Sequence, residues 1–382
     1  MQMQMPMEHH HHGATDPVSD FLMQQGSGTA TNPAAAPMHM LMTQSGDWML
    51  SGHANVFVNV VHESGPRGDD QLFSTNWFMG SAQRKLGDGQ LLLRGMLSLE
   101  PVMGQRGYPE LFQTGETAHG VALIDRQHPH DFFMELAAEY ARDFGNGTIG
   151  YVYAAPVGDP ALGPVAYPHR ASAAELPQAT LAHHLEDSTH IADGVLTFGA
   201  KHGEYGFAFS GFHGAEPDEN RWNIDRGGID SWAMRATWDP SPNWSAQIST
   251  GHLRDPERLE PGNVQRSTAS VSYANGAWSS SVIAGSNHRS DSTTVGITAE
   301  TVWQFNTSNY LTARAEIADK ELPERARIAA LTGGYTKDLY RSAHLLGGIG
   351  GNVTIYGFPS RLKSEYGDRP VSAYLFARLR LH

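Results

Sequence analysis

The sequence predicts an all-β fold, a transmembrane antiparallel β-barrel of about 16 strands, and three observations support it. Only 18% of the 382 residues are Asp, Glu, Lys or Arg, below the roughly 25% that is typical of soluble domains. Polar and apolar residues alternate with the two-residue period of a β-strand in several segments. Short and long connections alternate between these segments, as they do in bacterial outer-membrane barrels.

Composition excludes several other classes of protein. No run of about 18 apolar residues exists, so helical membrane spans are not expected. Cysteine is absent, which excludes thiol catalysis, zinc–cysteine sites and disulfide bonds. The net charge of −13 argues against a nucleic-acid partner, because phosphate-binding surfaces are basic. No arrangement of Ser, His and acid stands out along the chain, and we do not expect an enzyme.

The segment 371–381 shows the strand alternation most clearly. Its odd-numbered positions are Val, Ala or Leu, and its even-numbered positions are Ser, Tyr, Phe or Arg. Segments 91–100 and 295–305 behave similarly, and their polar faces also carry charges. A Lys or Arg on the lipid face at the bilayer midplane costs roughly 2–4 kcal/mol. We therefore expect the polar faces to line the lumen, with these charged residues pointing inward: Arg94, Glu100, Arg378 and Arg380.

Turn and loop signals divide the chain regularly. Short turns are expected at 87–89, 145–147, 202–204, 240–243, 275–276, 306–309 and 337–342. Longer polar connections are expected near 63–71, 104–130, 160–192, 214–229, 254–265, 287–293, 319–326 and 358–369. Seven short and eight long connections require 16 strands within residues 47–382, or 14–18 because two connections are weakly marked. The alternative is a soluble β-rich domain with long loops.

In a barrel of this topology, the short turns and both termini face the periplasm and the long loops face outside. Such a barrel lies in the lipid of the bacterial outer membrane and needs a secretory signal to reach it. Residues 1–12 are polar and lack the apolar core of a signal, so we expect that it is already removed. Six tryptophans near strand ends are expected to anchor the barrel at the membrane interfaces: Trp48, Trp77, Trp238, Trp244, Trp278 and Trp303. The oligomeric state stays open.

Residues 1–46, ahead of the barrel, are rich in methionine and histidine. Thioether sulfur suits Cu(I), and imidazole suits Cu(II) and zinc. A periplasmic metal-binding segment is therefore predicted, with these candidate ligands: Met1, Met3, Met5, Met7, His9, His10, His11, His12, Met38, His39, Met40 and Met42. Three alternatives remain: an apolar plug in the lumen, an expression tag at the His run, and a docking segment for a periplasmic protein.

The two longest connections, 104–130 and 160–192, carry a second group of candidate ligands. Both exceed the usual connection length and contain stiff or apolar residues, so we expect them to fold into the barrel, meet each other and narrow the pore. A helical turn at 183–190 would place two histidines and an aspartate on one face. The predicted loop metal site comprises His128, His130, Asp131, His183, His184, Asp187 and His190. The alternative is a hydrogen-bond network that pins the loops to the wall.

Four stretches, 32–40, 107–116, 126–131 and 216–221, resemble an uncharacterised family of bacterial outer-membrane barrel proteins, and the resemblance runs from Asp20 onward. The Met/His-rich head also resembles that of outer-membrane copper-resistance proteins, which implies binding or export of copper. Those proteins carry Met-Asp-His-type repeats, whereas this chain has Met-Gln-Met-Gln-Met-Pro-Met, so copper is implied only for the class. The main hypothesis is an outer-membrane barrel that handles copper or a similar metal ion. The alternative is a general porin or a structural membrane partner without metal specificity.

Overall fold

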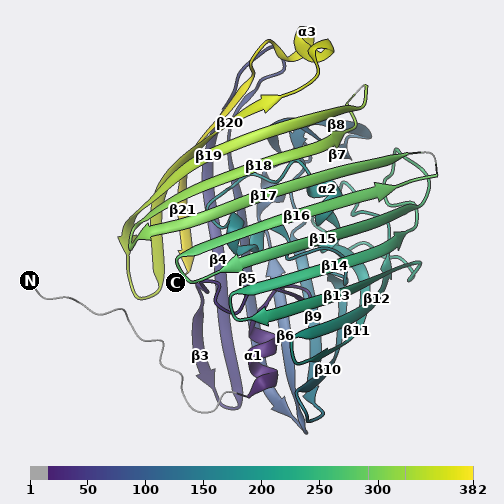
Figure 1. Ribbon diagram of the computed structural model, residues 1–382, viewed down its shortest axis with the longest axis vertical. Coiled ribbons are helices and arrows are strands. Elements are labelled where there is room, and N and C mark those ends of the chain that lie inside the picture. The colour runs from purple at the N-terminus through teal and green to yellow at the C-terminus, as the bar shows by residue number, and fades with distance from the viewer. Residues whose placement is uncertain (1–15, 291, 323, 382) are drawn as a thin grey trace, which may run out of the picture.

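The computed structural model describes residues 16–290, 292–322 and 324–381, and in this part of the chain sixteen strands close into an antiparallel barrel (Figure 1). The predicted fold class and strand number are confirmed. The strands of the wall are β4 (Trp48–Glu63), β5 (Asp70–Leu86), β6 (Gly89–Leu97), β9 (Phe133–Asp143), β10 (Thr148–Gly158), β11 (Ala192–His202), β12 (Tyr205–His213), β13 (Ser231–Ser241), β14 (Trp244–Leu253), β15 (Val264–Ala274), β16 (Trp278–His288), β17 (Thr293–Asn306), β18 (Asn309–Lys320), β19 (Ala326–Arg341), β20 (Leu345–Gly357) and β21 (Val371–Leu381). Each pairs with the next along this series, and β21 pairs with β4 to close the wall.

An extra strand, β3 (Leu41–Ser45), forms a hairpin with the first residues of β4. β4 is longer than β21, and β21 pairs only with the part of β4 from Asn55 to Glu63. β3 supplies hydrogen-bond partners to the remainder of β4, which would otherwise be an open sheet edge. The sheet therefore begins at Leu41, inside the segment that the sequence assigns to the N-terminal head.

The connections between the wall strands alternate short and long, as predicted. The last short turn differs in position, because β19 continues to Arg341 and the turn lies at 342–344 instead of 337–342. Asp338 looks like a turn residue in the sequence, but its carboxylate faces the lumen and forms an ion pair with Arg378. The charge pairing keeps this polar stretch in the strand.

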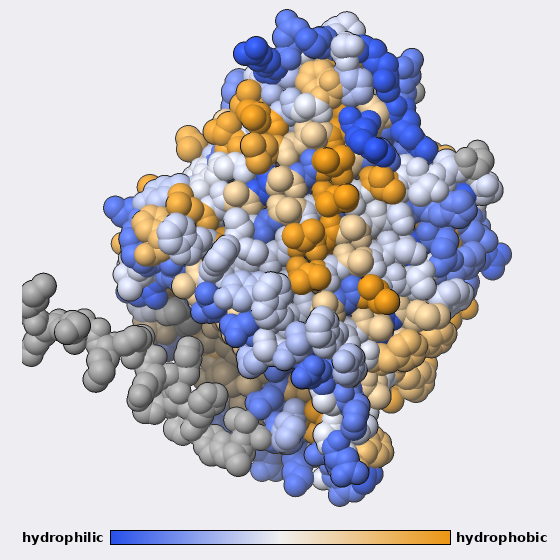
Figure 2. All heavy atoms as spheres, viewed as in Figure 1, coloured by the Kyte–Doolittle hydropathy of each residue, from blue (hydrophilic) through white to orange (hydrophobic). Residues whose placement is uncertain are grey.

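The wall has an apolar outer face and a polar inner face. In β21, Leu375 is 69% exposed and Arg378 is 1% exposed, although they are only three positions apart. Figure 2 shows hydrophobic residues running over the barrel strands and hydrophilic residues gathered at the top and right edges of the molecule. Trp238, Trp244, Trp278 and Trp303 are about half exposed at strand ends, as expected of interface anchors.

The expectation for Trp77 is wrong. The odd-numbered positions of β5 point into the lumen, because Phe73 and Thr75 are buried whereas Leu72 is exposed. The Trp77 indole accordingly packs on the His169 imidazole, with ring centroids 4.4 Å apart. The expectation fails because β5 is longer than the sequence suggests, so that Trp77 is the eighth of its 17 residues and not an end residue.

The helices are short. α1 (Pro17–Met23) begins with Asp16 as N-cap, whose side chain accepts the Val18 N–H at 3.1 Å, and with proline at its first position. α2 (His183–Glu186) and α3 (Lys363–Tyr366) are single turns. The 3₁₀ turns are η1 (Glu100–Met103), η2 (Tyr167–His169), η3 (Ala171–Ala173), η4 (Ser188–His190) and η5 (Ser360–Leu362). Among the described residues, none of the helices has both the length and the apolar character to cross a bilayer.

Three segments fold into the lumen. The first is the N-terminal segment 17–36, with α1, β1 (Gln25–Ser27) and β2 (Ala30–Thr31). Phe21 of α1 packs on Tyr151 of the wall at a ring-centroid distance of 5.1 Å. The second is the hairpin of β7 (Tyr108–Ala118) and β8 (Val121–Gln127), and the third is the connection 159–191, which contains α2.

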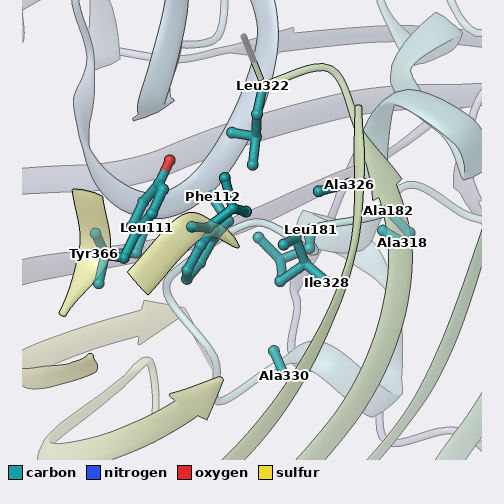
Figure 3. Packing of buried hydrophobic residues seen from close by; sticks show 11 residues of the cluster. Leu111, Phe112, Leu181, Ala182, Ala318, Leu322, Ala326, Ile328, Ala330 and Tyr366 are labelled. Carbon is teal, nitrogen blue, oxygen red and sulfur yellow. The ribbon is translucent and has the colours of Figure 1, made fainter. Parts of the chain in front are cut away.

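The two longest connections meet inside the barrel, as their length and apolar content predict. Figure 3 shows the contact: Leu111 and Phe112 of β7 lie with Leu181 and Ala182 of the connection 159–191 against the inner faces of β18 and β19. Hydrogen bonds join them too, since Gln113 Nε2 donates to the Thr180 carbonyl at 3.0 Å. The lumen is therefore filled by ordered chain over much of its height.

Candidate functional site

The N-terminal segment is held in the lumen by buried polar contacts. The Arg94 guanidinium donates to Glu135 of the neighbouring strand at 2.9 Å and also reaches the Gly28 carbonyl. Ser27 Oγ donates to Asp159 Oδ2 at 2.8 Å. Gly28 has a φ of +47°, and a Cβ at this position would collide with the backbone carbonyl of Asp159. The segment is thus held in place by the Arg94 guanidinium of β6 and by Asp159, the first residue after β10.

The Met/His-rich head is described only in part. Its first eight candidate ligands, Met1, Met3, Met5, Met7 and His9 to His12, lie outside the described residues. Met38 and His39 line a cavity at the periplasmic end of the lumen, and Met42 lies half exposed on β3. Met40 is partly buried beside them.

Two cavities lie at opposite ends of the lumen. The inner cavity, about 160 Å³, is lined by the N-terminal segment and by residues near the short turns, such as Ala277 and Gln304. The outer cavity, about 540 Å³, is lined by the long connections, by the β7–β8 hairpin and by the ends of β17 and β18. His169 and His53 face the inner cavity, and His184 faces the outer one.

Between the cavities, the structure brings together most of the histidines that the sequence predicts as ligands. His128, His183 and His184 each offer a ligand atom, and these three atoms lie within 4.8 Å of one another. The His183 and His190 rings are in contact, with centroids 5.4 Å apart. The His190 and His130 ring centroids are 5.3 Å apart. The hairpin strand β8 leads into His128 and His130, while α2 and η4 carry the other three.

Three of the buried rings, His183, His190 and His130, have Nδ1 held by an acceptor. His183 Nδ1 lies 2.6 Å from Asp187 Oδ1, and His190 Nδ1 lies 2.8 Å from the Asp187 carbonyl. His130 Nδ1 lies 2.9 Å from Glu100 Oε2. These contacts assign the proton to Nδ1 and leave a lone pair on Nε2, which is the arrangement that orients histidine ligands in metal sites.

His128 shows the clearest sign of a missing partner. Its Nδ1 lies 3.1 Å from the Pro129 carbonyl, which assigns its proton there. Its Nε2 lies 3.1 Å from Glu116 Oε1 but makes no hydrogen bond to it. Glu116 also forms an ion pair with Arg221, which favours its charged form. A lone pair and a carboxylate oxygen thus face each other, and a cation bound by both would relieve their repulsion.

Burial keeps the imidazoles of His183, His184 and His190 neutral. It lowers the pKa of His183 to about 4 and the pKa of His184 and of His190 to about 3. Burial alone would raise the pKa of Asp187, but the hydrogen bond from His183 and the charge of Arg170 outweigh it and lower that pKa. Neutral imidazole is the form that binds metal ions.

The backbone around the cluster fits it closely. His184 has no hydrogen-bond partner for either ring nitrogen among the described residues. Its ring lies against Gly115, which has a φ of +129°, and a Cβ there would collide with the imidazole. Glu116, next in the chain, has a φ of +57°, which is uncommon for a residue with a side chain. This irregular hairpin positions both Glu116 and the space for the His184 ring.

Asp131 does not join the cluster. Its carboxylate is directed to the Arg221 guanidinium, 3.5 Å away, and burial raises its pKa well above the usual range. Asp131 does not belong to the group whose ligand atoms converge, which is His128, His183 and His184. The Asp187 carboxylate accepts a hydrogen bond from His183 Nδ1, so Asp187 orients that imidazole and does not itself serve as a ligand.

The four charged residues expected in the lumen are all buried there. Arg378 pairs with Glu175 and Asp338, and Arg380 Nη1 lies 3.0 Å from Glu175. Glu100 lies in η1, not in a strand as the alternation suggests, because β6 ends at Leu97. Its carboxylate caps the backbone of Asn76 and holds His130.

Sequence reasoning misses three residues of the site: Glu116, His169 and Arg221. Glu116 and His169 lie in connections that the sequence marks as important, but nothing local to them distinguishes a ligand from an ordinary loop residue. Arg221 belongs to the acidic connection 214–230, and only the fold shows that it turns inward to Glu116. A second trio, Glu257, Glu260 and Glu321, also offers ligand atoms within 4.8 Å of one another, but the Arg289 guanidinium already pairs with two of them.

Comparisons with known proteins agree with the fold. The sequence matches no known protein family and no curated protein. The anion-selective porin from Comamonas acidovorans is 12% identical with a TM-score of 0.57, over 87% of this chain and 99% of that one. OmpF from Salmonella typhi, in complex with daunomycin, is 9% identical with a TM-score of 0.55, over 88% and 100%. The outer-membrane channel DcaP of Acinetobacter baumannii is 7% identical with a TM-score of 0.53, over 90% and 99%.

At these identities the likeness concerns the fold alone. This chain has the barrel fold of outer-membrane porins and channels. Its own surface agrees, because the apolar outer face and the half-exposed tryptophans suit contact with lipid. The fold and this surface together place the chain in the bacterial outer membrane, as predicted.

Proposed function

We propose that this chain is an outer-membrane channel for small solutes whose lumen is closed at rest. The observation that carries the proposal is the layer of buried side chains between the inner and outer cavities. Tyr167, Arg170 and His183 belong to this layer and are nearly inaccessible to solvent. A general porin-like channel is the alternative that the sequence analysis left open, and the fold supports it best.

The closing layer is anchored to the wall at several strands. Arg170 Nε donates to Glu300 of β17 at 2.6 Å, and its Nη1 donates to Asp187 at 2.9 Å. Lys320 at the end of β18 donates to the Leu181 carbonyl at 2.8 Å. Buried pairs of this kind are costly to break, because removal of one partner leaves a buried charge. Opening therefore requires a concerted shift of the connection 159–191.

Planar-bilayer recording tests this proposal. The purified chain should give a small single-channel conductance, and replacement of residues 163–188 by a short Gly/Ser linker should raise it. The linker variant must first migrate as a folded barrel on an unheated gel. A large, steady conductance of the unmodified chain, like that of an open sixteen-stranded porin, would contradict the proposal.

A second candidate function is metal binding in the lumen, and the convergence of His128, His183 and His184 favours it. Three imidazoles with Glu116 beside them offer a set of nitrogen and oxygen ligands that suits Zn²⁺ or Cu²⁺. Isothermal titration of Zn²⁺ into the purified chain should show one tight site that is lost in His183→Gln. Unchanged binding in that variant would leave the channel proposal standing without a metal.

Copper binding by the N-terminal head is a separate proposal, and it rests on the chemistry of the residues. Met has no proton to lose, so Cu(I) binding by thioethers persists at acidic pH, whereas His must be neutral to bind. Replacement of seven methionines by leucine keeps the apolar volume and removes the sulfur: Met1, Met3, Met5, Met7, Met38, Met40 and Met42. If Cu(I) affinity near pH 5 is unchanged, the head has no role in copper binding and serves as a plug.

A further inference from the structure

Four histidines form a row between the two cavities: His184, His183, His190 and His130, here called the histidine file. We propose that this file is a conduction path along which a divalent transition-metal cation passes between the outer and the inner cavity. The inference deepens the proposed metal binding and rests on it. The histidine file would be the route, and divalent transition-metal cations the solute, of a channel that is otherwise closed.

The spacing of the file suits transfer from one ring to the next. Ring centroids lie 5.1 Å apart for His184 and His183, 5.4 Å for His183 and His190, and 5.3 Å for His190 and His130. His128 lies beside the outer end, 5.3 Å from His184. A cation bound to one imidazole can therefore bind the next imidazole before it has fully left the first.

The orientation of the rings is fixed along the file. Acceptors engage Nδ1 of three members, so their Nε2 atoms carry the lone pair. At His130 the Tyr167 hydroxyl lies 3.5 Å from Nε2 and has to give way to a cation there. His190 Nε2 has no hydrogen-bond partner among the described residues, although the residue is only 7% exposed. A buried nitrogen without a partner normally costs free energy, so an unpaired lone pair in mid-file needs an explanation. A passing cation supplies one.

The file begins at the outer cavity and ends beside the inner one. His184 lines the outer cavity. At the other end, His130 lines a small space of about 20 Å³ together with Trp77 and Pro168, and these two residues also line the inner cavity. His169 follows there, in contact with Trp77, and within the described part of the chain neither of its ring nitrogens has a hydrogen-bond partner. The inner cavity also holds Met38 and His39 of the N-terminal head.

Conduction needs sites that bind an ion well enough to admit it and weakly enough to release it, and several adjacent sites achieve this. The outer end has the richest ligand set, since Glu116 and His128 stand beside His183 and His184. Along the rest of the file each ring offers a single nitrogen, so a cation is held less tightly and can move on. K⁺ and Na⁺ prefer oxygen ligands and gain little from imidazole nitrogen, which favours transition metals.

Zn²⁺ entry into lipid vesicles tests the path. The full chain is reconstituted into phosphatidylethanolamine–phosphatidylglycerol vesicles that enclose a zinc-responsive fluorophore, and Zn²⁺ is added outside. Zn²⁺ entry should saturate with concentration, and His190→Gln should slow it by about tenfold or more, in line with the cost of disturbing metal-site partners. Zn²⁺ binding at the outer end should be unchanged in His190→Gln, because His190 is not one of the three converging residues.

His62→Gln is the matched control, since His62 sits at the outer end of β4 with its side chain 66% exposed, and Zn²⁺ entry should be unaltered. Equal Zn²⁺ entry in His190→Gln and the unmodified chain would overturn the path. So would K⁺ entry as fast as Zn²⁺ entry, or a proton flux, read with a pH-sensitive dye, in place of a Zn²⁺ flux. Passage of K⁺ alone overturns the path and leaves the channel proposal intact. Passage of no ion at all also overturns the path alone, because the channel is proposed to be closed at rest.

If His190→Gln does not fold, X-ray absorption of the unmodified, Zn²⁺-loaded chain gives an independent test. Imidazole nitrogens should scatter at about 2.0–2.1 Å from the zinc. A zinc spectrum with oxygen neighbours and no imidazole signal would overturn the proposal.

Discussion

Gly115 determines where the His184 ring can lie. Its φ of +129° is available to glycine alone, and a Cβ at this position would collide with the imidazole. We expect Gly115→Ala to push His184 out of line with His128 and His183 and to weaken Zn²⁺ binding by about 10–100-fold, the usual effect of a disturbed metal-site surrounding. Isothermal titration measures the affinity.

Gly120→Ala is the control for this substitution. Gly120 lies at the tip of the same hairpin with a φ of +75°, and a Cβ there meets nothing within 4 Å. Both variants carry a backbone cost of a side chain at positive φ, which is larger at Gly115, and the contact with His184 is made only at Gly115. Equal affinities in the two variants would show that the position of His184 does not matter for binding.

Removal of the Arg94 side chain should destabilise the barrel. Its guanidinium is buried and forms an ion pair with Glu135 at 2.9 Å. Arg94→Met leaves the carboxylate buried without its partner, which costs about 3–5 kcal/mol in the free energy of unfolding. Arg142→Met removes an exposed pair with Asp88 and should cost about 0–1 kcal/mol. Reversible unfolding in guanidinium, with refolding into vesicles, measures both.

At the scale of elements, the N-terminal segment 17–36 depends on a close approach at Gly28. Gly28→Val places side-chain atoms against the Asp159 carbonyl and should release the segment from the lumen. Hydrogen exchange at the amides of 17–31 should then lose its protection, and the conductance should rise. Gly46→Val also adds a side chain at positive φ, but into open space in the β3–β4 turn, and should change neither quantity.

The same docking should weaken as the pH rises. Burial raises the pKa of Asp159 to about 8, and its neutral carboxyl accepts a hydrogen bond from Ser27. When the segment leaves, water reaches the carboxyl and its pKa returns toward the ordinary value of about 3.9. Between these two values the undocked state loses a proton that the docked state keeps, so docking loses stability with rising pH. Protection factors of residues 25–31 should fall from pH 5 to pH 8, and in Asp159→Asn they should not.

The elements show what the sequence can and cannot predict. The number of strands and the direction of their side chains can be predicted from the two-residue period, because apolar residues face the lipid and polar residues face the lumen. The period does not show where a strand ends and a capping turn begins, so the alternation suggests a strand at Glu100, which lies in η1. It also gives no information on contacts between connections. Convergence of His128 with His183 was a hypothesis about two loops, and the role of Glu116 follows only from the irregular hairpin that carries it.

At the scale of the whole molecule, the charge is distributed unevenly between the two ends of the lumen. The outer cavity is lined by nine acidic and four basic side chains, an excess of five acidic groups. Burial raises the pKa of Glu257 to about 7 and the hydrogen bond with Glu321 raises the pKa of Glu260 to about 8, so these two are partly charged at neutral pH. The inner cavity is lined by one acidic residue, Glu175, and by two basic residues, Arg170 and Arg380. A cleft with low-dielectric walls and one sign of charge concentrates the opposite ion, so cations should gather at the outer mouth.

This asymmetry predicts that the residual current prefers cations. In a KCl gradient the reversal potential should indicate a preference for K⁺ near 0.1 M salt, where charges act over about 10 Å, and the preference should fade near 1 M, where they act over about 3 Å. Neutralising three outer acids, Glu257→Gln, Glu260→Gln and Glu321→Gln, should reduce it. Removing three exposed acids away from the cavity, Asp88→Asn, Glu324→Gln and Asp368→Asn, changes the net charge equally and should leave it unaltered. A preference for Cl⁻ in the unmodified chain would show that the lumen arginines, not the outer acids, set the selectivity.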